Sequence, residues 1–390
     1  MYKVILKRNE ERDILNGQDR VYANEVSKIE GQGKNGDIAE VFDFNGSFLG
    51  KGFINHFSKI LVQLFIKDEN QDFTKELVLD RIQTANEYRK ILGFNNSYRA
   101  FFGNADGLPS LIVDKYNDIL VVQIQSLGMQ KNKQIIIDAL IEVFNPKGIY
   151  ERSDASIMEK EGLKPIKEKI FGEFETKVEI EENGLKLLVD VENGQKTGYF
   201  LDQKENRFAI RKYANTGVVL DCFCNAGGFA LNSAVAGAKE VFALDISPLA
   251  IEEVNVNAKL NNLDKIIKPI TCDVFKKLRE YKEEGKEFDT IILDPPAFCK
   301  SVSEVKDALR GYKDINVLAM KLVKKGGFLI SSSCTHFVSN QSFENMLKEC
   351  SIMSGRKAKI IEIRTQSSDH ASLITSEETT YLKFFVLQII

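Results

Sequence analysis

The sequence has little of what metal sites, membrane spans and disulfide-bonded folds require. It contains three His and six Cys, with no Cys-x-x-Cys pair, which argues against a structural zinc site. The cysteines also lack the dense spacing of small secreted domains, which indicates a reducing compartment. No apolar run approaches the roughly 20 residues of a membrane helix, and the charged start MYKVILKRNEERD is unlike a signal peptide. We therefore expect a cytoplasmic protein with no metal and no membrane partner.

An excess of charge of one sign is missing as well. The chain has 53 Lys and Arg against 56 Asp and Glu, a net charge of −3 and a pI near 5.9. Any surface that attracts nucleic acid must therefore be local. The hydrophobic content of 43% is ordinary for a globular protein, and 390 residues suggest two or three domains, each with its own core.

The most informative stretch is VVLDCFCNAGGFA, residues 218–230. It predicts a buried strand that ends at Asp221, a turn of small residues with Asn225, Gly227 and Gly228, and the start of a helix. Such a unit opens an α/β layer in which backbone N–H groups and a helix N-terminus face a ligand. The turn lacks the G-x-G-x-x-G spacing of a pyrophosphate-binding loop.

Three further predicted strands each carry an acidic residue near their carboxyl end: Asp245 in 240–247, Asp273 in 267–275 and Asp294 in 288–298. A single Asp at a strand end is more often a helix cap. In an open parallel sheet, however, the carboxyl ends of the strands border one crevice. The four acidic strand ends therefore predict a ligand site along one edge of the sheet.

In this order and spacing, the segment resembles the class I S-adenosylmethionine-dependent methyltransferases. The resemblance implies an α/β, Rossmann-like domain with a mostly parallel, twisted sheet. It further implies that Asp221 and the glycine turn hold the methionine part of S-adenosylmethionine and that Asp245 holds the ribose. Asp273 with Val274 would hold the adenine, and Asp294 would lie at the reacting end. Phe223 and Ile246, beside these positions, complete the implied cofactor contacts in this segment.

The chain before this domain predicts two smaller parts. Residues 1–73 alternate short apolar runs with turns, which favours a small barrel of antiparallel strands. They resemble a PUA domain, a small RNA-binding barrel, although a generic β module without RNA contact is the alternative. Residues 74–185 predict an α+β linking domain that begins with an amphipathic helix near 73–93. The methyltransferase domain is expected over 186–390.

Within these domains the pattern predicts further elements. In the linking domain these are two strands with turns over 97–126, a helix near 129–144, and strands at 148–151, 173–181 and 185–190. In the last domain they are a helix at 300–327, a strand from 326 to Cys334 and a closing strand at 381–390. The helix at 300–327 is locally basic, so it either contacts phosphates or is an ordinary solvated face. Its cations are Lys300, Lys306, Arg310, Lys313, Lys321, Lys324 and Lys325.

The segment VENGQKTGYFLDQKENR, residues 191–207, has more features than a surface linker needs. It resembles the loop that folds over S-adenosylmethionine in ribosomal RNA methyltransferases of the RlmI type. This resemblance implies that Lys196, Tyr199, Gln203 and Arg207 flank the cofactor or the substrate. The alternative is a hairpin that leads into a helix cap.

Cys334, at the end of GGFLISSSCTHF, is the candidate nucleophile. A nitrogen or oxygen can attack an activated methyl group directly once it is positioned. Carbon 5 of a pyrimidine becomes nucleophilic only after a thiolate adds to carbon 6. Asp294 is the second candidate catalytic residue, facing the N3 and amino edge of cytosine. Phe298 can stack on the base, and Pro295-Pro296 fixes the backbone beside it. The target base must be flipped out or single-stranded.

Two alternatives concern the same residues. DPPAF also resembles the NPPY-type motif of methyltransferases that act on exocyclic amines, and Cys334 would then be an ordinary strand cysteine. Cys299 is a rival thiol, but two prolines, Ala297 and Phe298 separate it from Asp294, so we expect it to lie past the site. The remaining cysteines are expected to pack in the core or on helices: Cys222, Cys224, Cys272 and Cys350.

His336 and His370 are candidate proton carriers for the final elimination, although a lone His is more often a hydrogen-bonded loop residue. His370 follows Asp369 in the C-terminal segment 368–390. By resemblance, this segment forms the last antiparallel strand pair of the sheet and a loop over the active site.

The resemblance covers nearly the whole chain and is to the bacterial large-subunit ribosomal RNA cytosine-C5 methyltransferases of the RlmI type. It implies methyl transfer from S-adenosylmethionine to a cytosine of 23S ribosomal RNA, and a homodimer is a candidate assembly. An inactive RNA-binding assembly factor is a different reading, against which the intact acidic residues and Cys334 argue. A small-molecule methyltransferase would not need the N-terminal half.

Overall fold

The computed structural model describes residues 1–153, 155–299, 301–376 and 379–390. The chain forms two compact units. Unit 1 contains Met1–Ile180, Val189–Leu201 and Ser368–Thr379. Unit 2 contains Glu181–Leu188, Asp202–Ser367 and Thr380–Ile390. The predicted division into three domains at residues 73 and 185 stays a prediction.

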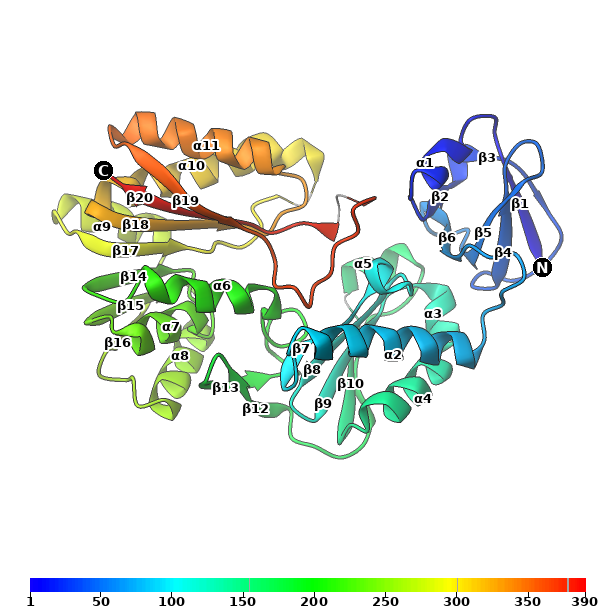
Figure 1. Ribbon diagram of the computed structural model, residues 1–390, viewed down its shortest axis with the longest axis horizontal. Coiled ribbons are helices and arrows are strands. Elements are labelled where there is room, and N and C mark those ends of the chain that lie inside the picture. The colour runs from blue at the N-terminus through cyan, green and yellow to red at the C-terminus, as the bar shows by residue number, and fades with distance from the viewer. Residues whose placement is uncertain (154, 300, 377–378) are drawn as a thin grey trace. The chain divides into compact units, whose positions relative to one another are not determined.

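Unit 1 begins with a six-stranded sheet of order β2-β6-β5-β4-β1-β3 (Figure 1). Its strands are β1 (Tyr2–Leu6), β2 (Arg20–Tyr22), β3 (Val26–Glu30), β4 (Ile38–Phe42), β5 (Phe48–Ile54) and β6 (Ile60–Ile66), with helix α1 (Glu11–Leu15) between the first two. The expectation of purely antiparallel strands is wrong at one pair, because β1 and β4 run parallel. The chain crosses from β3 to the other side of β1 before it enters β4, so β4 has the direction of β1.

The second part of unit 1 is a five-stranded sheet of order β11-β10-β9-β8-β7. Its strands are β7 (Ser97–Phe102), β8 (Leu111–Tyr116), β9 (Ile119–Ile124), β10 (Gly148–Ser153) and β11 (Ile166–Phe171). Its helices are α2 (Lys75–Ile91), α3 (Leu127–Lys131), α4 (Lys133–Phe144) and α5 (Ala155–Lys160). Helix α2 begins as predicted, because the Thr74 side chain accepts a hydrogen bond from the N–H of Leu77 at 3.3 Å.

Three expectations for this part need correction. The stretch 97–124 holds three strands, since both of its turns reverse the chain. The helix expected at 129–144 is two helices that meet at Asn132, whose φ of −105° is not helical. The strand β11 was not expected at all, because its centre is a run of three exposed charged residues, Lys167, Glu168 and Lys169.

Residues 368–370 are tied to this sheet and to α2. Arg89 is fully buried and donates to Asp106 Oδ1 at 2.7 Å and to the carbonyl oxygen of Asp369 at 2.7 Å. The Asp369 carboxylate accepts the backbone N–H of Arg99 at 2.7 Å. Of the last antiparallel strand pair predicted for the segment 368–390, the segment supplies one strand, β20 (Lys383–Ile389), and its partner β19 (Ala358–Arg364) precedes the segment.

A hairpin of β12 (Lys177–Glu182) and β13 (Leu185–Asp190) spans the boundary between the two units in the sequence. It alternates buried and exposed residues, as a strand with one covered face does. Its first strand begins four residues later than expected.

Unit 2 is built on a seven-stranded sheet of order β16-β15-β14-β17-β18-β20-β19. The strands are β14 (Val218–Cys222), β15 (Glu240–Asp245), β16 (Ile267–Thr271), β17 (Phe288–Leu293), β18 (Val323–Ser333), β19 (Ala358–Arg364) and β20 (Lys383–Ile389). β14 to β18 are parallel, and β20 is antiparallel to both of its neighbours. The predicted α/β, Rossmann-like domain is confirmed. Its last antiparallel pair is β19 with β20.

Helices cover both faces of this sheet (Figure 1). They are α6 (Lys204–Ala209), α7 (Gly228–Ala236), α8 (Pro248–Leu260), α9 (Val274–Glu283), α10 (Val305–Leu322) and α11 (Asn340–Ser354). Helices α9, α10 and α11 share one core with the strands, and Figure 1 shows α7 and α8 on the opposite face. The strand order reverses between β14 and β17, and ligands bind at such a switch point.

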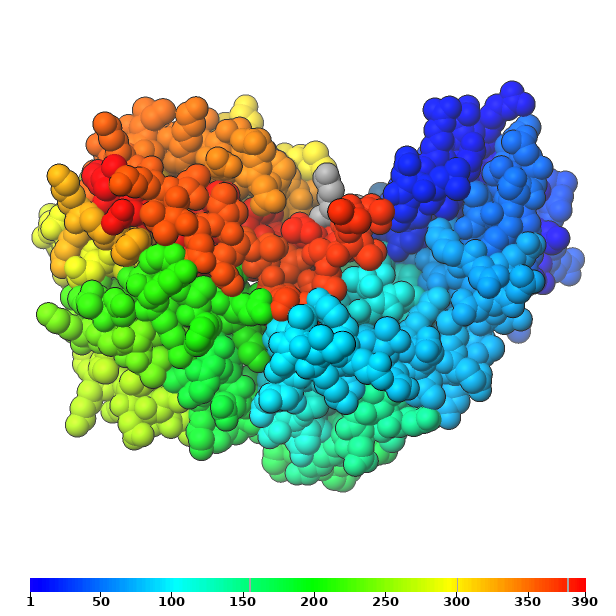
Figure 2. Space-filling view, viewed as in Figure 1, coloured from blue at the N-terminus to red at the C-terminus, as the bar shows by residue number. Residues whose placement is uncertain are grey.

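The end of helix α10 and the edge strand β19 differ from what the sequence predicted or add to it. Helix α10 ends at Leu322 rather than 327, because Val323 already pairs with Phe288 as the first residue of β18. Strand β19 is an edge strand with three exposed isoleucines, Ile360, Ile361 and Ile363, and it lies at the surface of unit 2 in Figure 2. The homodimer stays a prediction. No helix among the described residues is long and apolar enough to cross a bilayer.

Candidate active site

The four acidic residues predicted from the sequence lie along one edge of the sheet of unit 2. Asp221 is near the end of β14, and Asp245 ends β15. Asp294 directly follows β17, and Asp273 lies two residues after the end of β16. The strands are parallel neighbours, with Cys222 opposite both Leu244 and Leu293. Because parallel strands place their carboxyl ends on one side, the four carboxylates border the switch point.

The turn after β14 has the backbone shape that a close ligand contact needs. Phe223, Asn225 and Gly227 have φ values of 64°, 48° and 86°, all left-handed. A Cβ at Gly227 would lie 3.2 Å from Val254, so this position requires glycine for both conformation and space. Gly228 then opens α7. The turn therefore directs backbone N–H groups and a helix N-terminus toward the switch point.

Asp221 is fully buried. Neither of its carboxylate oxygens accepts a hydrogen bond of ordinary distance and angle from the described residues. Burial raises its pKa well above the usual value, and the neighbouring Asp294 raises it further. The N–H of Ala230 and the Arg207 charge offset only part of this. A buried carboxylate without a partner beside a glycine turn fits a ligand that carries a positive amino group.

Asp245 and Asp273 have partners of their own. Asp245 accepts the N–H of Asn225 at 3.0 Å and the N–H of Ser247 at 2.9 Å, so it fixes the turn after β14. Asp273 caps α9 by accepting the N–H of Lys276 at 3.2 Å. The side chain of Ile246 is 70% exposed next to Asp245, which leaves it available to a flat ligand. The Val274 side chain is buried in the core, so only its backbone is available.

Asp294 is held by two donors. Its Oδ1 accepts hydrogen bonds from Gln203 Nε2 at 2.8 Å and from the Ser332 hydroxyl. Gln203 is in turn fixed by Asn206, whose amide donates to Gln203 Oε1 at 2.7 Å. Burial raises the pKa of Asp294, and this outweighs the two hydrogen bonds, which lower it. Asp294 and Gln203 were each predicted from the sequence, independently of one another, as cofactor contacts. The structure shows that they form a hydrogen bond with each other.

The residues after Asp294 form an aromatic wall. The half-buried Phe298 ring lies 4.5 Å from the Tyr312 ring and 6.0 Å from the Phe275 ring, measured between centroids. Pro295 is buried and Pro296 is exposed. One part of Phe298 therefore packs in the core, and the remainder is accessible to a base.

Cys334 directly follows β18 and is half-buried. Ser332, two residues earlier, binds Asp294. Because β17 and β18 are parallel neighbours, Asp294 and Cys334, which directly follow them, lie at the same carboxyl edge of the sheet. Cys299 is 3% exposed, and its thiol lies 3.2 Å from the Thr335 hydroxyl. Of the two thiols, Cys334 is the accessible one.

Of the other predicted residues, Lys196, Tyr199 and His370 belong to unit 1 and His336 belongs to unit 2. Tyr199 is buried in unit 1, where its backbone N–H and carbonyl both bind the Tyr116 hydroxyl, at 3.1 and 3.2 Å. Lys196 lies over the Phe200 ring at 4.5 Å. His370 is buried in unit 1 with its Nδ1 2.9 Å from Asp369 Oδ1, whereas His336 is exposed in unit 2, close to the Tyr381 ring. Their assigned roles stay predictions.

Arg207 has a structural role in unit 2. Its guanidinium binds both oxygens of Glu182, at 2.6 and 2.7 Å, and both side chains are almost fully buried. We expect Arg207→Met to lower the free energy of unfolding by about 3–5 kcal/mol, because it leaves a buried carboxylate unpaired. Urea denaturation measures this. Arg310→Met, which breaks an exposed pair with Asp307, is the control and should cost less than about 1 kcal/mol.

Three of the cations predicted for the basic helix form ion pairs, two of them on α10 and one, Lys324, at the start of β18. Arg310 pairs with Asp307, Lys313 with Glu349, and Lys324 with Asp289. Lys300 lies outside the described residues. Phosphate contact and an ordinary solvated face both stay predictions for this helix.

Sequence reasoning missed several residues of the site. Ser332 could have been found from the alternation of SSSC, and Lys383 from a single lysine at the start of an apolar strand. Tyr312 and Asn206 gave no local signal. Among the described residues, no cluster of His, Cys, Asp and Glu could hold a metal ion.

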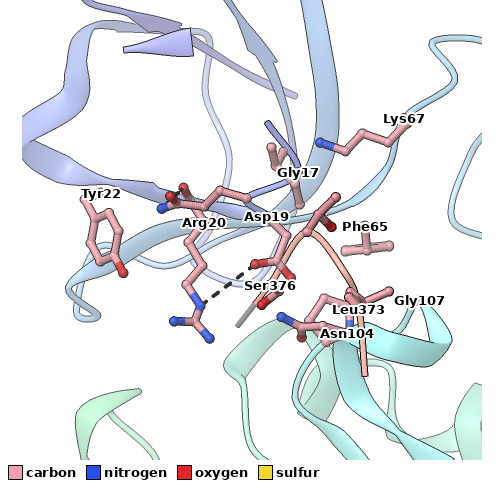
Figure 3. Close-up of a pocket in the computed structure, with 14 residues that line it drawn as sticks. Gly17, Asp19, Arg20, Tyr22, Phe65, Lys67, Asn104, Gly107, Leu373 and Ser376 are labelled. Carbon is pink, nitrogen blue, oxygen red and sulfur yellow. Dashed lines mark hydrogen bonds and ion pairs between the residues drawn. The ribbon is translucent and has the colours of Figure 1, made fainter. Parts of the chain in front are cut away.

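A hollow of 420 Å³ lies in unit 1 (Figure 3). It is lined by the segment 17–22, the end of β6, the turn after β7 and part of 373–376. Arg20 and Lys67 bring positive charge to it, and Tyr22 and Phe65 bring aromatic rings. Cations beside aromatic rings are typical of surfaces that bind single-stranded nucleic acid.

Comparison with known proteins agrees with this geometry. Residues 178–334 match the family model of the TRM5/TYW2 methyltransferase domain, and residues 4–66 match that of a PUA-like domain. The chain is 38% identical over 391 residues to the ribosomal RNA large subunit methyltransferase I of Aeromonas salmonicida, covering 99% of this chain and 98% of that protein. It is 34% identical over 392 residues to the protein of the same name from Escherichia coli, covering 99% of each.

Solved structures resemble the whole chain. A protein of Streptococcus mutans, assigned to the S-adenosylmethionine-dependent methyltransferases, superposes with a TM-score of 0.85 at 20% identity, covering 100% of both chains. A second structure, assigned as a methyltransferase and complexed with SAH, superposes with a TM-score of 0.84 at 19% identity over 100% of both chains. At this identity the likeness shows the fold.

Proposed function

Because the chain belongs to the family of the ribosomal RNA large subunit methyltransferase I, we propose that it methylates carbon 5 of a cytosine in 23S ribosomal RNA. It is an S-adenosylmethionine-dependent methyltransferase with an N-terminal PUA-like domain. The finer assignment depends on one observation. An accessible Cys334 follows the strand whose Ser332 binds Asp294, a carboxyl group with a raised pKa.

S-adenosylmethionine supplies, when bound, a methyl group on a positively charged sulfur. The proposed work of the protein begins at Cys334, whose thiolate adds to carbon 6 of the cytosine. As the bond between sulfur and carbon 6 forms, the π electrons of the carbon 5–carbon 6 double bond shift into the ring, and carbon 5 becomes nucleophilic. After carbon 5 has gained the methyl group, a base removes its proton. The released electron pair restores the double bond and expels the thiolate.

Asp294 would assist the addition. Electron density builds up at N3 of the ring when the thiolate adds, and a proton donor there stabilises it. The raised pKa of Asp294 favours the protonated carboxyl, which can donate this hydrogen bond. Gln203 and Ser332 fix its orientation. The aromatic wall at Phe298 would support the flipped base.

Holding S-adenosylmethionine falls to residues of the glycine turn and the strand ends. In this proposal, the partnerless carboxylate of Asp221 takes the amino group of the methionine part. Asp245 and Ile246 lie beside the ribose and the base, and the backbone near Asp273 and Val274 borders the adenine. That Lys196 and Tyr199 flank the cofactor or the substrate stays a prediction from the sequence resemblance.

The assignment is tested by the product. The purified protein, S-adenosylmethionine and ribosomal RNA from a strain that lacks the enzyme should yield 5-methylcytidine, measured by nucleoside mass spectrometry. N-methylated guanosine or adenosine in place of 5-methylcytidine would favour the exocyclic-amine alternative, and no methylated nucleoside would favour an inactive assembly factor.

The hollow in unit 1 supports RNA binding by the N-terminal part. We expect Lys67→Glu to weaken binding of ribosomal RNA fragments by about tenfold and to reduce the salt dependence by about one phosphate contact, because a phosphate-binding cation is replaced by an anion. Fluorescence anisotropy at several salt concentrations measures this. Lys90→Glu on α2, an exposed lysine outside the hollow, is the matched control. Equal losses in the two variants would contradict a role for the hollow.

A further inference from the structure

Lys383 is an unusual residue for its place in the fold. It is the first residue of β20 and pairs in register with Ser333, the residue that precedes Cys334. It is only 3% exposed, at the start of a strand that is otherwise apolar or nearly so. Lysine is almost never fully buried unless its charge is compensated.

Among the described residues, the Lys383 ammonium group is bound by two neutral acceptors. Its Nζ donates to the carbonyl oxygen of Thr335, the residue after Cys334, and to that of Tyr381 at 2.8 Å. In the described part of the chain, its contacts are these two carbonyl oxygens and no ion pair with a carboxylate. Burial lowers the pKa of Lys383 to about 8, and negative charge on Cys334, then on Cys299, acts in the opposite direction.

The other titratable groups near Cys334 come from α10, from the segment after β17 and from the segment of Cys334 itself. Asp294, directly after β17, accepts a hydrogen bond from Ser332, and burial raises its pKa. Tyr312 on α10 accepts a hydrogen bond from the Ser333 hydroxyl at 3.0 Å, and burial raises its pKa, which keeps it neutral. Cys299, in the segment after β17, contacts the Thr335 hydroxyl. His336 is exposed to solvent. Of the described residues in this group, Lys383 is the buried cation.

We propose that Lys383 is a positioning residue whose ammonium group stabilises the thiolate form of Cys334 and holds the end of β18 in place. Interaction between two ionisable groups is mutual, so a thiolate that favours charged lysine is itself favoured by charged lysine. A proton that passes from the thiol to a neutral Lys383 leaves an ion pair with no change in net charge. Thiols beside a lysine ionise at lower pH than the ordinary value of about 8.5.

The inference deepens the proposed function, since a thiolate is what addition to carbon 6 requires. Its test, however, does not depend on methyl transfer. Alkylation by iodoacetamide follows the thiolate fraction, and peptide mass spectrometry resolves each cysteine separately. Cys272 is the internal control, because it is half-buried like Cys334 and burial raises its pKa.

In the wild-type protein, we expect the pH midpoint of Cys334 alkylation to lie at least one unit below that of Cys272. Lys383→Met should raise the Cys334 midpoint by about one unit or more and slow its alkylation at pH 7 about tenfold, with Cys272 unchanged. Lys383→Arg should keep the low midpoint. Lys383→Gln retains hydrogen-bond donors without charge and should behave like Lys383→Met.

Calorimetry with S-adenosylmethionine and thermal unfolding identify variants that have lost the fold. The comparison of the Cys334 and Cys272 alkylation midpoints in the wild-type protein does not depend on any variant folding. A wild-type Cys334 midpoint equal to that of Cys272, or an unshifted midpoint in both Lys383→Met and Lys383→Gln, would overturn the inference. A low midpoint in a protein that methylates an amine would leave Lys383 as proposed and refute carbon methylation alone.

Discussion

Cys334→Ala is expected to abolish methyl transfer, with a loss of about a thousandfold or more, because removal of a covalent nucleophile leaves carbon 5 of the pyrimidine without nucleophilic character. Binding of S-adenosylmethionine should change less than about twofold, since Cys334 is assigned no contact with it. Methylation is measured by nucleoside mass spectrometry and cofactor binding by calorimetry.

Cys272→Ala is the matched control for this variant. Cys272 is half-buried, directly follows β16 and has no proposed role, so its loss should leave activity within about twofold. RNA containing 5-fluorocytidine adds a positive test, because fluorine at carbon 5 blocks the final proton removal. Wild-type protein should form an adduct that survives denaturation, and Cys334→Ala should not. Retained activity in Cys334→Ala would move the assignment to the exocyclic amines.

The methyltransferase fold could be predicted because its signals are local. VVLDCFCNAGGFA contains a complete strand, turn and helix start. For α8, Ser247 is the N-cap and Pro248 is the first helical residue. The polar strands β2, β3 and β11 gave no such signal. Their residues are mostly half-buried or exposed, so pairing with distant strands, rather than composition, makes them strands.

The candidate site was predicted residue by residue, but not as a network. Gln203 and Asp294 lie 91 positions apart and bind each other, and no pattern in one sequence reveals such a pair. Arg207 was expected near the cofactor, and its partner Glu182 lies in the preceding hairpin. The role of Asp273, in contrast, follows from local sequence alone. An Asp between a strand and a helix is expected to cap the helix, and Asp273 caps α9.

The second large effect concerns Asp221. Its raised pKa means that the unliganded protein holds a proton there over a range in which an ordinary Asp is ionised. A cationic amino group placed against it favours the carboxylate, so binding of S-adenosylmethionine should expel that proton. Below the pKa of the free protein, we expect the affinity to fall about tenfold for each pH unit and one proton to be released on binding. Above that pKa the affinity should become constant.

The sign of the stability effect follows from the same shift. A buried acid whose pKa is raised in the folded state stabilises the fold below its unfolded pKa, and this contribution is lost as the pH rises through the folded value. The unliganded protein should therefore unfold more easily above that pH, and S-adenosylmethionine should reverse the loss. Calorimetry in two buffers of different ionisation enthalpy counts the released protons, and denaturation at several pH values measures the stability.

Asp221→Asn separates the carboxylate from the rest of the turn. It should bind S-adenosylmethionine at least about tenfold more weakly, with no proton release and little pH dependence, because the amide cannot ionise. Asp273→Asn is the control, since Asn caps a helix as well as Asp does and the proton release should persist. If wild type and Asp221→Asn released the same number of protons, the partnerless carboxylate would not be where the positive charge of the ligand binds, and the amino group would have to lie against another of the strand-end acids.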